Sequence, residues 1–111
     1  MAQLPNHEHA EIDIAKLRDY CLSPTHLRGR HKARLFASAL GISAVDAVWL
    51  LGAILNELGN TEAAKDVSDQ FGQRWRVDVL LTRQNRRAVV RTVWLIPHGQ
   101  SNAKLITAWV L

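Results

Sequence analysis

The spacing of hydrophobic and polar residues changes near the middle of this chain. Up to about residue 60 the apolar residues recur every three or four positions, as in amphipathic helices. From Arg74 onward they alternate with polar residues, as in strands that bury one face. The sequence therefore predicts an α+β fold, with N-terminal helices packed on one face of a C-terminal antiparallel sheet of three to four strands.

Three helices are expected in the first half. Asp13 can cap a helix from Ile14 to about Leu22, which Pro24 ends. A second helix is expected from about Arg30 to Leu40, and a third between the capping residues Ser43 and Asp46 and the stop at Gly59. The buried stripes expected from the spacing are Ile14, Leu17 and Cys21, then Ala33, Phe36, Ala37 and Leu40, then Val45, Val48, Trp49, Leu55 and Leu58.

Three strands are expected in the second half, joined as an antiparallel meander. A hairpin turn at Gln84 and Asn85 places Asp78 opposite Arg91 and Trp75 opposite Trp94, and both pairings are chemically favourable. The last strand is expected from Lys104 to Leu111. A short strand is possible at residues 10–12, and the connection at residues 60–73 is expected to be partly helical.

Length, charge and cysteine content narrow the class of protein. A chain of 111 residues, 48% of them hydrophobic, predicts one domain, assigned to residues 4–111. The excess of 14 Lys and Arg over 10 Asp and Glu favours an anionic partner. A single cysteine predicts a reducing compartment, and the lack of an export signal or a membrane-length apolar run predicts a cytoplasmic protein without membrane contact.

The segment THLRGRHKA places cations at the start of the second predicted helix. Arg30, His31 and Lys32 oppose the helix dipole there, and the arrangement becomes favourable if an anion binds the free backbone N–H groups. Gly29 permits close approach of a phosphate. The alternative is that these are solvated side chains at a helix start, with His26 making a local cap.

A second group of cations lies on one face of the predicted sheet, comprising Arg74, Arg76, Arg87 and Arg91 beside Asp78. In one interpretation Arg91 and Asp78 form an ordinary cross-strand ion pair. In the other, an RNA backbone lies on this face and Arg91 binds a phosphate in bidentate fashion.

No metal or cofactor is expected. His7 and His9 are not followed by further ligands at a recognised spacing, and no glycine-rich nucleotide loop is present. Cys21 lies on the apolar stripe of its helix, which argues against a nucleophilic role.

The order of several short motifs resembles a family of small uncharacterised bacterial domains. That family has the pattern LPN, KLRDYLL, H-x-x-G-x-x-KA, VD, VRTxWxI and TAY, and this chain matches it from Leu4 almost to its end. The resemblance implies a toxin domain, found in polymorphic toxins or beside an antitoxin or immunity protein. It also implies a layout similar to the barnase, EndoU, colicin and RelE group of ribonucleases.

Matching the motifs assigns residues to this resemblance. His26, Gly29 and Lys32 match H-x-x-G-x-x-KA. Arg91, Thr92 and Trp94 match VRTxWxI, and Thr107 matches TAY. Trp109 departs from the tyrosine that ends TAY. The predicted register turns Thr92 toward the apolar face, whereas Thr107 can reach a substrate if the last strand is offset by one residue.

The leading hypothesis is a toxin-like ribonuclease that cleaves RNA, including tRNA, by attack of the 2'-hydroxyl without metal. His26, His31, Lys32 and Arg91 are the candidate catalytic residues, because such cleavage needs an acid, a base and cations for the phosphorane. The candidate substrate-binding residues are Gly29, Arg30, Arg74, Arg76 and Thr107. The alternative is a non-catalytic immunity or adaptor module whose basic face binds an acidic protein; a DNA-binding domain ranks third.

Overall fold

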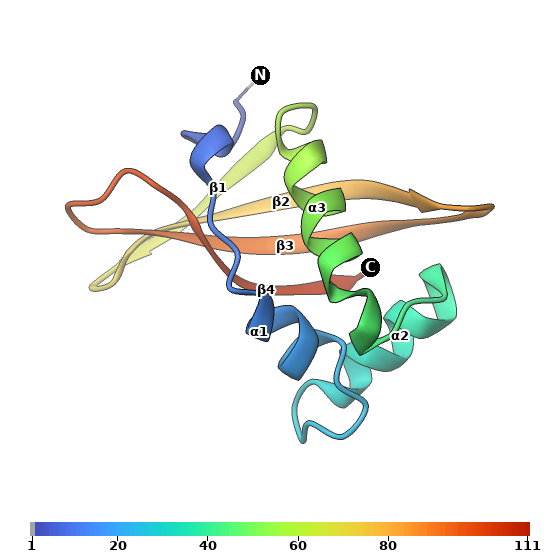
Figure 1. Cartoon of the computed structure of the whole chain (residues 1–111). Coiled ribbons are helices and arrows are strands. Elements are labelled where there is room, and N and C mark those ends of the chain that lie inside the picture. The colour runs from blue at the N-terminus through green and yellow to red at the C-terminus, as the bar shows by residue number, and fades with distance from the viewer. Residues whose placement is uncertain (1) are drawn as a thin grey trace.

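A computed structural model describes residues 2–111 and has the predicted α+β layout, with helices preceding a four-stranded antiparallel sheet (Figure 1). Because this order matches the change of period along the chain, the predicted fold class is confirmed. The helical elements are η1 (His7–His9), α1 (Ile14–Lys16), η2 (Leu17–Cys21), α2 (Arg30–Leu40), η3 (Ala44–Asp46) and α3 (Ala47–Leu58). The strands are β1 (Ala63–Asp69), β2 (Gly72–Arg83), β3 (Arg86–Pro97) and β4 (Lys104–Val110).

The first predicted helix exists but is not a uniform α-helix. Asp13 caps it as expected, because its side chain accepts a hydrogen bond from the N–H of Ala15. After Lys16 the chain winds into the π-helix η2, closed by a hydrogen bond of 2.8 Å from the N–H of Leu22 to the carbonyl of Leu17. The wider turn changes the direction of the side chains that follow it.

The second and third helices begin and end where their caps predict, but part of the expected burial is wrong. Gly41 ends α2 with a φ of 67°, and Ser43 and Asp46 form the expected capping box. Ala37, Val45 and Val48 are nevertheless exposed. The tighter 3₁₀ turn of η3 shifts the phase of the helix that follows. The buried stripe of α3 is therefore Ala47, Leu50, Ile54 and Leu58.

The sheet is a simple meander in the order β1-β2-β3-β4. The expectation of a partly helical connection at residues 60–73 is wrong, since β1 pairs with β2 there. The possible strand at residues 10–12 is reduced to a single parallel bridge between Glu11 and Lys104 at the outer edge of β4.

The register of the central hairpin is the predicted one. Trp75 lies opposite Trp94 and Asp78 lies opposite Arg91, around a turn in which Gln84 has a φ of 56°. Between β3 and β4 the register shifts: Trp94 pairs with Leu105, but Val93 pairs with Thr107. The extra residue, Ile106, is a β-bulge.

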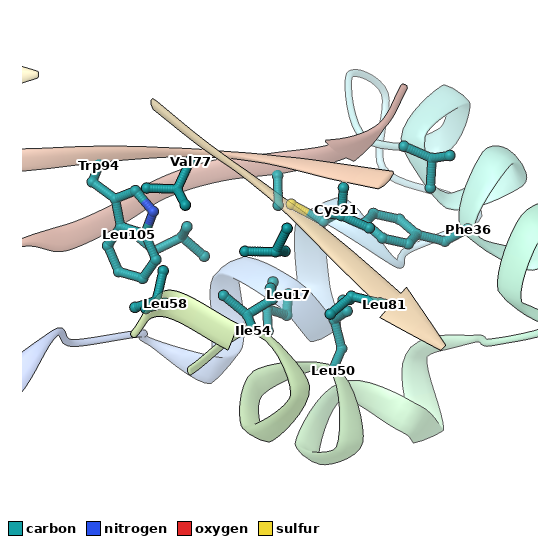
Figure 2. Packing of buried hydrophobic residues seen from close by; sticks show 14 of the residues in the cluster. Leu17, Cys21, Phe36, Leu50, Ile54, Leu58, Val77, Leu81, Trp94 and Leu105 are labelled. Atoms are coloured by element: carbon teal, nitrogen blue, oxygen red, sulfur yellow. The ribbon is translucent and has the colours of Figure 1, made fainter. Parts of the chain in front are cut away.

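The hydrophobic core fills the space between the helices and one face of the sheet (Figure 2). At its centre the indole N–H of Trp94 donates to the hydroxyl of Thr92 over 2.8 Å. That hydroxyl donates in turn to the carbonyl of Val77 over 2.7 Å. Thr92 is fully buried, so the structure confirms that it points toward the apolar face. Among the described residues, every buried side-chain nitrogen and oxygen atom has a hydrogen-bond partner, so these polar atoms are accommodated in the core.

Within residues 2–111 no single helix is long and apolar enough to cross a membrane; only α2 taken together with residues 44–58 reaches that length and hydropathy, and this pair is bent by 74°.

Candidate functional site

The ammonium group of Lys32 is the centre of a cluster at the outer edge of β4. Its Nζ donates to the hydroxyl of Tyr20 over 2.8 Å and to the hydroxyl of Thr107 over 3.1 Å. It also lies 4.6 Å from the ring centre of Tyr20 and 5.5 Å from that of Trp109, within the range of cation–π attraction. Together with His26, which packs on Tyr20, these residues are called the Lys32 cluster: Tyr20, His26, Lys32, Thr107 and Trp109.

The Lys32 cluster holds a half-buried positive charge without a carboxylate. Among residues 2–111, no Asp or Glu oxygen lies within 4.0 Å of the Lys32 ammonium. An ammonium group has three N–H donors, and two are used by Tyr20 and Thr107. A partly desolvated cation with a remaining donor is suited to an anionic ligand.

The loop before α2 packs against Tyr20. The Nδ1 atom of His26 accepts hydrogen bonds from the backbone N–H groups of Arg28 and Gly29, each over 3.0 Å, so its neutral ring carries the proton on Nε2. The ring packs edge-to-face on Tyr20, with centres 4.8 Å apart. A Cβ atom on Gly29 would lie 2.0 Å from the carbonyl oxygen of Tyr20. Only glycine fits at this position.

The three defined residues of the H-x-x-G-x-x-K segment therefore act together to hold the loop and the start of α2 against Tyr20. His26 folds the loop, Gly29 lets it approach Tyr20, and Lys32 reaches the Tyr20 hydroxyl from the first turn of α2. The π-helix η2 contributes the other half, because it carries Tyr20 next to the buried Cys21. π-Helical turns are rare and frequently occur at functional sites.

The bulge in β4 brings Thr107 to the cluster. Its hydroxyl lies 3.1 Å from the Lys32 ammonium and 3.8 Å from the sulfur of Cys21. The register shift at Ile106 supplies the one-residue offset on which the expected role of Thr107 depends, and that role in contacting a substrate stays a prediction. Trp109 follows two residues later, where the resemblance expects tyrosine.

Arg91 lies beside the cluster but is already paired. It is opposite Trp109 in the sheet, and its guanidinium donates twice to the carboxylate of Asp78, over 2.9 Å in each case. These hydrogen bonds lower the pKa of Asp78 and raise the pKa of Arg91. The pairing matches the structural interpretation of Arg91, so a phosphate would have to compete with Asp78 for it.

The other predicted site residues are spread over the surface. His31 is exposed in the first turn of α2, and Arg30 lines a groove of about 300 Å³ between residues 22–24 and α2. Arg74 is paired with Asp69 over 3.0 Å near the β1–β2 turn. Arg76 is half-buried and has no salt bridge among the described residues. Among the described residues, neither Arg74 nor Arg76 forms a hydrogen bond or ion pair with the Lys32 cluster, so Arg91 is the sheet arginine that lies beside it.

Tyr20 and Trp109 were not predicted as site residues. Tyr20 lies one position off the apolar stripe of its helix and belongs to the KLRDY motif, which was the available signal. For Trp109 the sequence indicates only a departure from TAY. Across residues 2–111, no group of three or more His, Cys, Asp or Glu side chains is placed to hold a metal ion.

The chain belongs to a family of domains of unknown function, DUF6883, whose model matches residues 3–111. No curated protein and no solved structure matches the chain.

Proposed function

We propose that the protein is a toxin-like ribonuclease and that the Lys32 cluster binds the phosphate at which RNA is cut. The observation that carries the proposal is the half-buried Lys32 ammonium with hydroxyl groups on two sides and no carboxylate partner among the described residues. The formal charge of +4 and the exposed cations of the first turn of α2 attract a polyanion to the same edge.

The geometry suggests a role for each side chain. Lys32 and the hydroxyl of Thr107 hold the non-bridging phosphate oxygens, and the ring of Trp109 offers a surface on which a base stacks. His26 contributes a hydrogen bond from Nε2, because its Nδ1 is occupied by two backbone N–H groups. This occupancy favours a binding role for His26 over proton transfer.

Cleavage then needs a base and an acid close to the phosphate. His31 accepts the proton of the 2'-hydroxyl, whose oxygen attacks the adjacent phosphorus. The bond between phosphorus and the 5'-oxygen breaks, and the hydroxyl of Tyr20, held by Lys32, gives its proton to the leaving oxygen. The products are a 2',3'-cyclic phosphate and a free 5'-hydroxyl. An antitoxin or immunity protein is the partner proposed to restrain this activity.

The test is incubation of the pure protein with total RNA and with tRNA in the presence of EDTA. Wild type is expected to leave 2',3'-cyclic phosphate ends, and Lys32→Met and His31→Ala are expected to lose at least about 100-fold in rate, the usual scale for one acid–base or charge-stabilising group. Lys104→Met is the matched control, because Lys104 is an exposed lysine at the other end of β4. His31 is exposed, so its substitution leaves the fold intact.

Intact RNA with every variant would reject the ribonuclease and favour the second candidate, a non-catalytic immunity or adaptor module that binds an acidic protein. Two observations favour that candidate: Asp78 occupies Arg91, and the Nδ1 atom of His26 is used within the loop. In that case the Lys32 cluster holds the helices to β4, and the partner binds the face of the sheet that points away from the hydrophobic core.

A further inference from the structure

The distal half of β2 is an uncovered sheet edge. β1 pairs with β2 only as far as Ala63 opposite Val77, so residues 78–83 have β3 on one side and no strand on the other among the described residues. In Figure 1 the end of this hairpin projects beyond α3. An edge of this kind is a template for another strand.

The hairpin geometry shows which backbone groups are free. Arg83 and Arg86 flank a two-residue turn and form a hydrogen-bonded pair, so the alternation along β2 directs Leu81, Val79 and Val77 toward β3. The hydrogen bond from the Thr92 hydroxyl to the Val77 carbonyl agrees with this alternation. Leu80 and Thr82 therefore direct their N–H and C=O groups outward.

A groove lined by both apolar and polar side chains lies beside these free groups. It has a volume of about 440 Å³ and is lined by α3 and the β2 edge, including Val48, Gly52 and Leu80. Val48 is 71% exposed and Leu80 is 45% exposed. Apart from the backbone of α3 itself and the residues next to Gly52 in the chain, no atom of the described residues lies within 4 Å of the position that a Cβ atom on Gly52 would take, so the groove is open there.

This edge also lacks the usual protection. Exposed edges are commonly blocked by lysine, proline or a bulge, but residues 78–83 read DVLLTR and pair with β3 without a register shift. Arg83, the one cation in the segment, is folded back onto Asp46 over 3.1 Å.

We propose that a second copy of this chain pairs with the β2 edge, forming a twofold dimer with one continuous sheet. The strands run antiparallel with the axis at Leu81, which places Leu80 opposite Thr82 of the partner subunit. In this register each outward N–H of Leu80 and Thr82 donates to a free C=O of the other chain, and each outward C=O accepts from a free N–H.

The side chains support a second copy as the occupant. A twofold axis perpendicular to the sheet keeps both copies of α3 on the same side of it, so the exposed Val48 of each copy lies beside the junction and helps to fill the groove at Gly52. Directly opposite pairs bring Asp78 to Gln84 and Val79 to Arg83, and no like charges face each other. The interface is independent of the proposed ribonuclease site, which lies on the opposite edge.

Sedimentation of the full chain over a range of protein concentrations tests the proposal. Wild type is expected to approach twice the mass of one chain as its concentration rises. Leu80→Lys and Thr82→Pro are expected to remain at the mass of one chain, because they add a charge to the edge or remove an outward N–H. Leu35→Lys is the matched control; Leu35 is 48% exposed but lies on α2. It is expected to dimerise like wild type.

Circular dichroism of each variant checks that the chain has folded. Two chemically different edge variants are used, so that the conclusion does not depend on one variant that fails to fold. A wild type that keeps the mass of one chain at every concentration overturns the proposal and leaves the edge to a strand from another protein. Dimers that persist in both edge variants overturn it as well, because the contact would then lie elsewhere.

Discussion

The two outer edges of the sheet differ in how much of the chain covers them. Along β4, Glu11 bridges Lys104, and the side chains of Cys21 and Lys32 both lie against Thr107. Along the distal half of β2, the outward groups of Leu80 and Thr82 have a groove beside them, and no strand of residues 2–111 pairs with them. The N-terminal helices thus cover one edge and create the Lys32 cluster there, whereas the other edge stays available to a second chain.

The difference has a simple origin in strand length. β1 has 7 residues and β2 has 12, so the terminal strand is too short to cover its neighbour. β4 also has 7 residues, but the chain that precedes the sheet supplies its cover. The distal edge of β2 is therefore uncovered because β1 is short, whereas the edge of β4 is covered because the N-terminal segment lies beside it.

The largest predicted difference in stability is between substitutions of two glycines, Gly29 near the β4 edge and Gly52 near the β2 edge. Gly29→Ala is expected to cost about 3 kcal/mol or more in the free energy of unfolding, because the new Cβ overlaps the Tyr20 carbonyl. Gly52→Ala is expected to stabilise α3 by about 0.5–1 kcal/mol, since its Cβ meets open space. Denaturant unfolding of both variants measures the contrast. A Gly29→Ala protein as stable as wild type would show that the loop is not held tightly against Tyr20.

A smaller difference in stability is predicted between substitutions of two threonines of the β2–β3 hairpin. Thr92→Val removes the acceptor of the buried Trp94 indole N–H and is expected to cost about 1–3 kcal/mol. Thr82→Val lies on the exposed edge and is expected to change stability by no more than about 0.5 kcal/mol. Both are measured by unfolding at protein concentrations too low for association. Equal effects would contradict the buried role of Thr92.

The smallest effect concerns pH. The hydrogen bonds from Arg91 lower the pKa of folded Asp78 below its ordinary value of 3.8, so their stabilisation is present above that value and is lost as the pH falls through the lower folded pKa. The difference in unfolding free energy between wild type and Asp78→Asn is therefore expected to shrink on acidification below pH 3.8. A difference that stays constant with pH would mean that the ion pair adds nothing measurable to stability.

Local signals predicted much of the fold. The bounds of α2 follow from its apolar spacing and Gly41, and the Ser43 and Asp46 capping box marks the start of the next helix. The charge pairing of Asp78 with Arg91 identified the hairpin register. Each of these features depends on neighbours along the chain or directly across one tight turn.

Other features left no clear local signal. β1 was missed because it is an edge strand, mostly exposed, whose sequence AAKDVSD has no apolar alternation. The burial of Val45 and Val48 was predicted wrongly because a 3₁₀ turn shifts the helical phase. Tyr20 was missed because its importance comes from Gly29, Lys32 and the π-helical turn acting together.

The sequence by itself determined the order of helices and strands, the caps and the central register, because these depend on interactions between residues close in the chain. It also supplied the residues of the H-x-x-G-x-x-K segment. Only the tertiary structure decided that Lys32 meets Thr107, 75 residues away, and that the distal half of β2 has no neighbouring strand on one side within the described part of the chain. Such outcomes depend on the path of the whole chain, since the packing of the helices determines which strand edge they cover.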